Sequence, residues 1–380
     1  MLKVHDELGQ TGPGRDRPTV TEPDGETSLP RLLIPLTIHF AVRYVVRTGL
    51  LDRLRSVCVP VLALSWDDPE LVAELSGPGV EVVRLPDAEV SPEVRGLLNA
   101  LEVPFTRRLG SPSTRIDQRR KFVDRPAEVR LKKWLAWERT QLEAMVPGAE
   151  ERTRERLAVA LANGTNLAEN KSFLAEHRIE ALFSVTPFAI QELVVLHAAH
   201  RRAIPAITSI LSFDNITTRP PLPITFDRYL VWNAYNADEI RRGYPWVPPA
   251  TIDIVGPGQF DFYADPQYVQ DRATWLARIG VSPEVPTVLY GAGPPSVSPH
   301  EDQYVDDLIA AIRRGALPRD LKIVLRRHPT DHPARWERFR ADPAVAFDDP
   351  GALGTEHYRP GQVNMARAQI VDLCSALAHT

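Results

Sequence analysis

The chain has 380 residues, of which 25% are charged and 43% hydrophobic, and its formal net charge is -4. This balance is typical of a soluble globular protein with room for two domains, and it excludes a strong attraction toward nucleic acid. No apolar run reaches the roughly 20 residues that span a bilayer, and the polar start lacks the apolar core of a signal peptide. Because its two cysteines, Cys58 and Cys374, lie in or beside apolar runs, we expect buried free thiols and a cytoplasmic protein.

The first third of the chain alternates between strand-like and helix-like segments. Residues 1–27 are rich in Gly, Pro and acidic residues, and we expect a disordered tail. Apolar runs then predict strands over 31–40, 57–65 and 80–86, separated by helices over 41–56 and 67–79. Strands that alternate with helices indicate a parallel sheet covered on both faces.

Residues 91–176 interrupt this alternation with a helical excursion. The stretch "RRLGSPSTRIDQRRKF" within it is basic, and Trp134 and Trp137 follow shortly after. A solvated helix face explains such a composition, and the alternative is a patch that meets an anionic acceptor or the surface of a membrane.

The alternation resumes after the excursion and predicts a second sheet toward the C-terminus. We expect strands over 179–187, 204–211, 226–232 and 251–258, with helices between them, then a linker near residue 265. A further unit opens with a strand at 287, followed by strands over 321–329 and 345–350 and a fourth over 366–377. The fold class is therefore α/β with two Rossmann-like domains, 28–265 and an abbreviated 266–380.

In such sheets ligands bind beyond the carboxyl ends of the strands, so polar residues there are the candidates. His39 closes the first strand and titrates near neutral pH, although a buried histidine with a satisfied ring explains it as well. Asp214 and Asn215 follow the strand over 204–211, among hydroxyl residues, and could accept and orient a substrate hydroxyl. An Asx-turn is the alternative there, and the hydroxyls of "SVTP" (184–187) are explained by a helix cap.

Two turns of the second domain have the composition of an anion site. Gly291 and Gly293 in "LYGAGPPSVSPH" let backbone N–H groups approach a phosphate, and Ser296 and Ser298 add donors, but this is no standard phosphate-binding motif. In "VLRRHPTDHP", Arg326 and His328 follow a strand and suit a diphosphate, and a basic surface turn is the alternative. No spacing of residues typical of a metal site is evident.

These features together resemble the GT-B glycosyltransferases. The resemblance covers most of residues 30–375 and rests on "IVGPGQFDFY" at the domain junction (Val255 to Asp261 within it) and on "RRHP". It is strongest to bacterial enzymes of the CDP-glycerol glycerophosphotransferase kind and weaker to UDP-N-acetylglucosamine 2-epimerases. The resemblance implies a nucleotide-diphosphate sugar or CDP-alcohol as donor substrate and no separate cofactor, with Arg326, His328 and the glycine turn on the donor side.

Two departures from this family narrow the function that we expect. Where glycerophosphotransferases carry a His-Gly-Thr-Pro run, this chain has Ser212 to Asn215, and the donor-side helix with its Ser/Thr and Glu does not follow 366–377. We therefore expect transfer of a sugar or sugar phosphate to a glycan or lipid-linked acceptor in surface polysaccharide assembly, with peripheral contact to the inner face of the membrane. A nucleotide-sugar epimerase and a truncated, non-catalytic scaffold are the alternatives.

Overall fold

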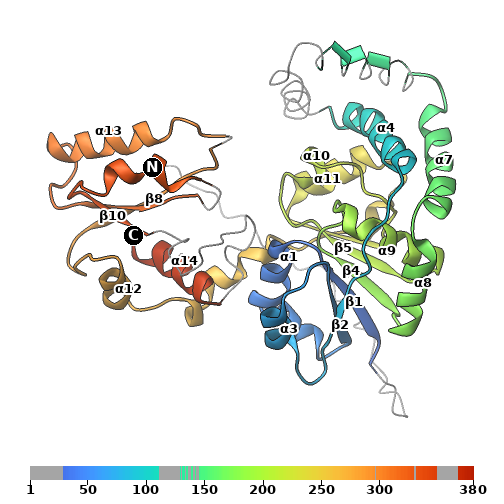
Figure 1. The fold of residues 1–380 in the computed structure, drawn as a ribbon, viewed down its shortest axis with the longest axis horizontal. Helices are drawn as coiled ribbons and strands as arrows, with labels where there is room; N and C mark the ends of the chain where they lie inside the picture. The colour runs from blue at the N-terminus through green and yellow to red at the C-terminus, as the bar shows by residue number, and fades with distance from the viewer. Residues whose placement is uncertain are drawn as a thin grey trace, which may run out of the picture.

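The computed structural model describes residues 29–110, 145–295, 297–328, 331–348 and 367–380, together with positions 129, 131, 132, 134, 135, 138, 139 and 142. The expected tail over 1–27, most of the basic stretch and Ser296 lie outside the described residues. Figure 1 shows two lobes, with the N-terminal part of the chain forming the larger one. None of the described helices has the length and apolar content needed to cross a bilayer.

The first lobe is built on a seven-stranded parallel sheet. Its strand order is β3-β2-β1-β4-β5-β6-β7, so the first six strands follow the order of a classic Rossmann sheet. The strands are β1 (Arg31–Leu36), β2 (Val59–Leu64), β3 (Glu81–Arg84), β4 (Ala181–Ser184), β5 (Ala206–Ser209), β6 (Arg228–Val231) and β7 (Ile252–Ile254). The order reverses between β1 and β4, which places the switch point of this sheet at their carboxyl ends.

Helices cover both faces of this sheet because successive strand residues point to opposite sides. In β1, Leu33 packs with the helices that follow β4 and β5, whereas Ile34 and Leu36 pack on the other face with the segments after β1 and β2. The covering helices are α1 (His39–Val42), the π-helical η1 (Arg43–Arg47), α2 (Leu50–Leu54), α3 (Pro69–Leu75), α8 (Leu167–Glu176), α9 (Ile190–Arg201), α10 (Asn215–Thr218) and α11 (Ala234–Gly243). The expected helix over 41–56 is thus broken by the π-helical turn and by Gly49, whose φ of 74° favours glycine.

The helical excursion leaves the sheet after β3 and returns before β4. It includes helices α4 (Pro92–Leu109), α7 (Ala149–Asn163) and α8, and α4 packs against α7 through Leu97, Leu101 and Leu157. Figure 1 shows α4 and α7 beside the edge of the first lobe that carries α10 and α11. The excursion therefore forms one wall over the carboxyl ends of β4 and β5.

The second lobe has a three-stranded parallel sheet, ordered β10-β9-β8, which corresponds to one half of a Rossmann sheet. The expected two-domain α/β fold with an abbreviated second domain is confirmed. Its elements are β8 (Thr287–Gly291), α13 (Asp302–Arg313), β9 (Lys322–Arg326), β10 (Val345–Phe347), α12 (Arg272–Arg278) and the short 3-10 turns η5 (Pro333–Arg335) and η6 (Glu337–Phe339).

The strand expected over 366–377 is wrong, because these residues fall in helix α14 (Arg367–His379). Ile370 and Cys374 pack on one side against Phe262 in the linker, and Ala376 packs on another side near Trp275. A strand would turn alternate residues to opposite faces, whereas a helix brings residues three and four apart onto one face. Both cysteines are buried free thiols, as expected.

A linker of 3-10 turns joins the lobes. It follows β7 and comprises η3 (Gly258–Ala264) and η4 (Pro266–Tyr268), whereas the 3-10 turn η2 (Pro249–Thr251) lies before β7 within the first lobe. Gly258 permits a close approach to η1, since a Cβ there would lie 3.3 Å from Cε2 of Tyr44. The carboxyl side of β1 therefore lies directly against the junction of the lobes.

Candidate functional site

A buried carboxyl group lies at the switch point of the first sheet. Glu192 on α9 is 0% exposed and accepts hydrogen bonds from Ser184 at the end of β4, from Thr186 just after it, and from Thr37 after β1, the last at 3.1 Å. Burial raises the pKa of Glu192 to about 7, and the three hydroxyl donors oppose that shift only in part. Ser184 and Thr186 thus tie β4 to α9 through Glu192.

His39 lies at the first turn after β1, as its sequence position indicates. Its ring packs edge-on against Trp66, with 4.7 Å between ring centroids. Partial burial lowers the pKa of His39, and the nearby Asp68 carboxylate opposes this shift. The imidazole is therefore mostly neutral at pH 7, which is the form that accepts a proton.

The Asp214 turn after β5 satisfies many of its polar groups internally. The Asp214 carboxylate accepts a hydrogen bond from Ser212 at 2.6 Å and a longer one from the Asn215 amide at 3.4 Å. Its backbone carbonyl accepts from Thr217 and Thr218, at 3.1 and 2.8 Å. Asp214 precedes helix α10, but its carboxylate accepts no backbone N–H there, so the bond that defines an Asx-turn is absent among the described residues. Side-chain hydroxyls and one amide hold the carboxylate instead, and no hydrogen bond or ion pair joins Asp214 to His39 within the described part of the chain.

The glycine turn after β8 is organised around Glu301. Gly291 ends the strand, and the N–H of Gly293 donates to Oε2 of Glu301 at 3.0 Å. A Cβ at position 293 would lie 3.2 Å from Oγ of Ser298, so glycine is favoured by the close packing. The backbone N–H of Gly293 is therefore engaged by a carboxylate of the same turn.

The two turns predicted on the second lobe lie together at the carboxyl edge of its sheet. Arg335 joins them, because it donates to the backbone carbonyl of Ser298 at 2.8 Å and to Asp331 at 3.0 Å. His328 lies close enough to Asp331 and Glu301 for both carboxylates to raise its pKa, but burial is the larger effect and the pKa is lowered. Gly293 and His328 are thus parts of one cluster.

Arg326 lies at the end of β9, where successive side chains point to opposite faces of the sheet, and its side chain points away from that cluster. Its side chain lies on the same face as Val324, toward α12 and α14, and donates to Asp348 and to Asp372, the latter at 2.9 Å. Arg278 on α12 completes the network by pairing with both carboxylates. Asp348 is 0% exposed, so the guanidinium of Arg326 already neutralises buried charge within the lobe.

Arg43 at the junction of the lobes has the opposite surroundings. It is only 8% exposed, and no described residue forms an ion pair or hydrogen bond with its guanidinium, whose Nε is buried. Its charge lies 4.8 Å from the ring centroid of Phe40 and 5.6 Å from that of Phe262 in the linker. Burial lowers the pKa of Arg43. Burial raises the pKa of Tyr263, and the nearby charges of Arg43 and Arg326 oppose that shift. The described neighbours of this buried cation are aromatic rings and the Cys374 thiol, with no carboxylate among them, so the guanidinium can bind an anion.

Arg43, Glu192, Glu301 and Arg335 were not singled out by the sequence reasoning. Arg43 and Arg47 interrupt the apolar run "AVRYVVR" four residues apart, which is a signal of buried charge that the helical spacing obscured. Arg47 finds Glu74 as its partner, whereas Arg43 does not find one among the described residues. Such a difference depends on tertiary contacts and cannot be recognised from one sequence.

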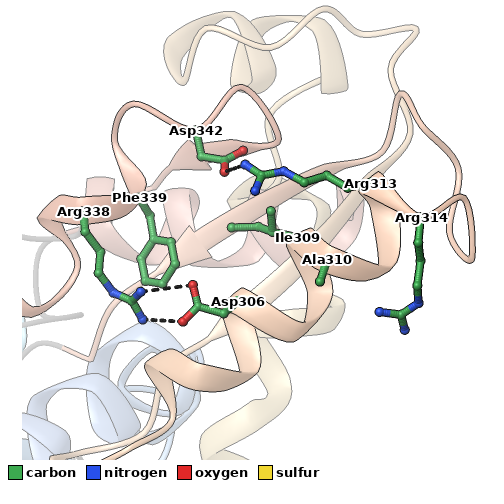
Figure 2. Close-up of a pocket in the computed structure, with 8 residues that line it drawn as sticks. All are labelled: Asp306, Ile309, Ala310, Arg313, Arg314, Arg338, Phe339 and Asp342. Carbon is green, nitrogen blue, oxygen red and sulfur yellow. Dashed lines mark hydrogen bonds and ion pairs between the residues drawn. The ribbon is translucent and has the colours of Figure 1, made fainter.

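A separate hollow of about 600 Å³ lies between α13 and the segment 338–342 (Figure 2). Arg338 pairs with Asp306, and Arg313 pairs with Asp342 at 2.5 Å, so these charges largely satisfy one another. Among the described residues, no cluster of three or more side chains could hold a metal ion.

Comparisons with known proteins found similarity in structure only. No family model and no curated protein matches the sequence. Similar solved structures include a Listeria monocytogenes protein assigned as a UDP-N-acetylglucosamine 2-epimerase (TM-score 0.46, 9% identity, 85% of this chain and 70% of that one). They also include a glycosyltransferase from Rickettsia africae (TM-score 0.45, 8%, 85% and 69%). A third is the UDP-GlcNAc 2-epimerase of Methanocaldococcus jannaschii in complex with UDP-GlcNAc and UDP (TM-score 0.42, 10%, 84% and 73%).

Likenesses at these identities and TM-scores say nothing about substrate or reaction. The fold assignment rests on the chain's own two parallel sheets, the first in Rossmann order and the second with half of that order. With these two sheets joined by a short linker, the chain has a fold of the GT-B type.

Proposed function

We propose that the chain binds a nucleotide-activated sugar at the junction of its lobes, with Arg43 as the partner of the diphosphate. The observation that carries this proposal is the buried guanidinium of Arg43, which has no counter-ion among the described residues. Leaving a charge buried and unpaired costs free energy, and an anionic ligand would remove that cost. Planar, bidentate donation also suits a phosphate.

Under this proposal the first domain (28–265) holds the acceptor and the second (266–380) holds the donor nucleotide. Asp214 would take or orient the acceptor hydroxyl proton, with Asn215 and the neutral ring of His39 beside it. Arg43, together with His328 and the Gly291–Gly293 turn, would stabilise the charge that develops on the leaving diphosphate. One well-placed donor contributes about 3–4 kcal/mol to such a transition state. We assign this role to Arg43 rather than Arg326, whose charge is already matched by two carboxylates.

The binding half of the proposal is tested by calorimetric titration with UDP, CDP and GDP, and with the matching nucleosides. Arg43→Gln is expected to weaken binding of the preferred diphosphate by about 10- to 100-fold, the range for a charge-assisted hydrogen bond. The nucleoside alone should bind both proteins equally, and the exposed Arg53→Gln serves as the control. Equal affinity of Arg43→Gln for the diphosphate would contradict the proposal, and no binding of any nucleotide would favour a scaffold.

The reaction itself is tested with a labelled donor sugar. Transfer predicts release of the nucleotide only when an acceptor is present, whereas an epimerase converts the nucleotide sugar into its epimer without any acceptor. Asp214→Asn should lower kcat and leave the Kd of the nucleotide unchanged, because the acid would act on the acceptor and not on the donor.

We also propose that the acceptor is lipid-linked and that the helical excursion touches an anionic membrane. Its described residues present exposed apolar side chains at helical spacing, with Lys132 and Arg139 beside them. The exposed apolar residues are Leu131, Trp134, Leu135, Leu142, Met145 and Val146. Co-sedimentation with vesicles containing anionic phospholipid should retain the chain at low salt, and Trp134→Glu with Leu135→Glu should release it. Equal binding by the double variant would contradict this placement.

A further inference from the structure

A hollow of about 280 Å³ lies beneath the helical excursion, at the carboxyl edge of the first sheet. One wall comes from α4 and α7, and another from the start of α9 with the segment just before it. The third wall is the segment 220–223, which follows the Asp214 turn and α10 and contains all three prolines of "RPPLP". Figure 1 shows that α4, α7 and α9 belong to the same side of the first lobe as α10 and α11.

The walls of this hollow are mainly apolar. Its apolar lining consists of Leu98, Leu101, Leu157, Pro187, Phe188, Ala189, Ile190, Leu193, Pro220, Pro221, Leu222 and Pro223. Protein interiors are close-packed, so an open apolar space of this size is more typical of a ligand site than of a core. Its chemistry selects a ligand whose body is hydrocarbon.

Three polar side chains line the hollow, and they differ in how far they are already engaged. Arg154 pairs with Glu150 at 2.8 Å and lies 3.9 Å from the ring centroid of Trp246, so its charge is matched. Arg95 and Asn99 are exposed on α4, and within the described part of the chain the guanidinium of Arg95 forms no ion pair or hydrogen bond. The rim therefore offers one uncompensated positive charge, which suits an acidic head group.

A second hollow of about 210 Å³ adjoins the first, because both are lined by Arg154, Leu157, Leu222 and Pro223. It extends toward Tyr229, Tyr244 and Trp246. A ligand too long for the first hollow could continue along this seam between α7 and the segment 220–225. Because the two hollows adjoin, they favour a ligand with an extended alkyl chain over one with a compact ring system.

We infer that this hollow binds an acidic amphiphile, with its alkyl chain among the leucines and prolines and its carboxylate or phosphate at Arg95. The inference deepens the proposed function, on which its role rests: the hollow would hold the apolar part of the acceptor next to the Asp214 turn. Binding of the amphiphile requires no nucleotide, so it can be measured even if sugar transfer fails.

The test is calorimetric titration with straight-chain carboxylates from hexanoate to tetradecanoate, each below its micelle concentration. The Kd should fall about fourfold for each added methylene, the value expected for burial of a CH₂, until the hollow is filled. Alkyl phosphates of the same lengths form a second arm and identify the preferred head group. A Kd that does not change with chain length would overturn the inference.

Two variants locate the binding site. Leu98→Trp places a larger side chain in the hollow and should weaken decanoate binding at least tenfold, while Val159→Trp on the outer face of α7 is the matched control. Arg95→Gln should weaken carboxylates about two- to fivefold, the effect of an exposed charge, and leave alkyl glucosides unchanged. Should Leu98→Trp fail to fold, Leu98→Phe replaces it. Unchanged decanoate affinity in a folded Leu98 variant would refute the site.

Discussion

Two buried arginines in this molecule have opposite surroundings. Arg326 in the second lobe lies between two buried aspartates, whereas Arg43 at the lobe junction lies between two aromatic rings with no carboxylate partner among the described residues. Both residues are 8% exposed, so burial alone does not distinguish them. The comparison suggests a rule: a buried arginine paired with carboxylates stabilises the fold, whereas one without a carboxylate partner is available to bind a ligand.

The contrast extends to the lobes that surround each residue. The first lobe has seven strands and large apolar clusters on both faces, while the second has three strands and correspondingly less apolar surface to bury. A small sheet has little hydrophobic stabilisation in reserve. In the second lobe the network of Arg326, Arg278, Asp348 and Asp372 links β9, α12, α14 and the residue after β10.

The largest effect is expected from breaking that network. Among the described residues, Arg326→Met leaves the half-exposed Arg278 as the one cation paired with Asp348 and Asp372, although Trp275 still donates to Asp372. Removing one partner of a buried charge network costs about 3–5 kcal/mol of unfolding free energy. Urea unfolding followed by the fluorescence of the buried Trp275 and Trp336 measures the loss. The exposed Arg319→Met is the control, and a loss below about 1 kcal/mol would mean that the network does not hold the lobe together.

Glu192 differs from the aspartates that pair with Arg326, because it is a buried acid whose partners are hydroxyls and not cations. Its pKa is raised by burial to about 7 in the folded chain, above the ordinary 4.5 of the unfolded chain. The protonated group therefore contributes stability that is complete below pH 4.5 and is lost as pH rises through 7. The loss is roughly 3 kcal/mol for a shift of this size.

This linkage is measured by urea unfolding at pH 5 and pH 8. Glu192→Gln cannot ionise and should show a smaller decline in stability than the native chain, and the difference isolates the one group. Glu155→Gln on the outer side of α7 should follow the native profile. Parallel pH profiles for the native chain and Glu192→Gln would show that the carboxyl keeps its ordinary pKa.

A substitution of Arg43 is expected to change the unfolding free energy in the direction opposite to Arg326→Met. Arg43→Met removes a buried charge without removing a carboxylate partner, so we expect unfolding free energy between unchanged and about 2 kcal/mol higher. The same variant should lose diphosphate binding, which is the trade-off typical of a ligand site. Thermal unfolding without and with UDP checks both statements, and strong destabilisation of the ligand-free variant would assign Arg43 a structural role.

Much of the fold could be predicted from the sequence because apolar runs and their breaks define the strands directly. The run over 366–377 failed because a short buried apolar segment fits a strand or a helix equally, and only its packing on Phe262 and Trp275 decides. The candidate site was less predictable. Position after a strand located the glycine turn and His328, but the alternation that turns Arg326 inward and the missing partner of Arg43 arise from tertiary structure.

The smallest effect on stability is expected at the hollow of Figure 2, where the second lobe carries ion pairs on its surface. Arg338 is about half exposed and pairs with Asp302 and Asp306 on α13, and exposed pairs of this kind contribute about 0–1 kcal/mol. Arg338→Gln should therefore lower unfolding free energy by less than 1 kcal/mol, and 0.5 M NaCl should reduce that difference further, because salt screens exposed pairs. Urea unfolding at low and high salt checks both. A loss as large as that of Arg326→Met would show that the number of ion pairs, and not their burial, determines the stability of the second lobe.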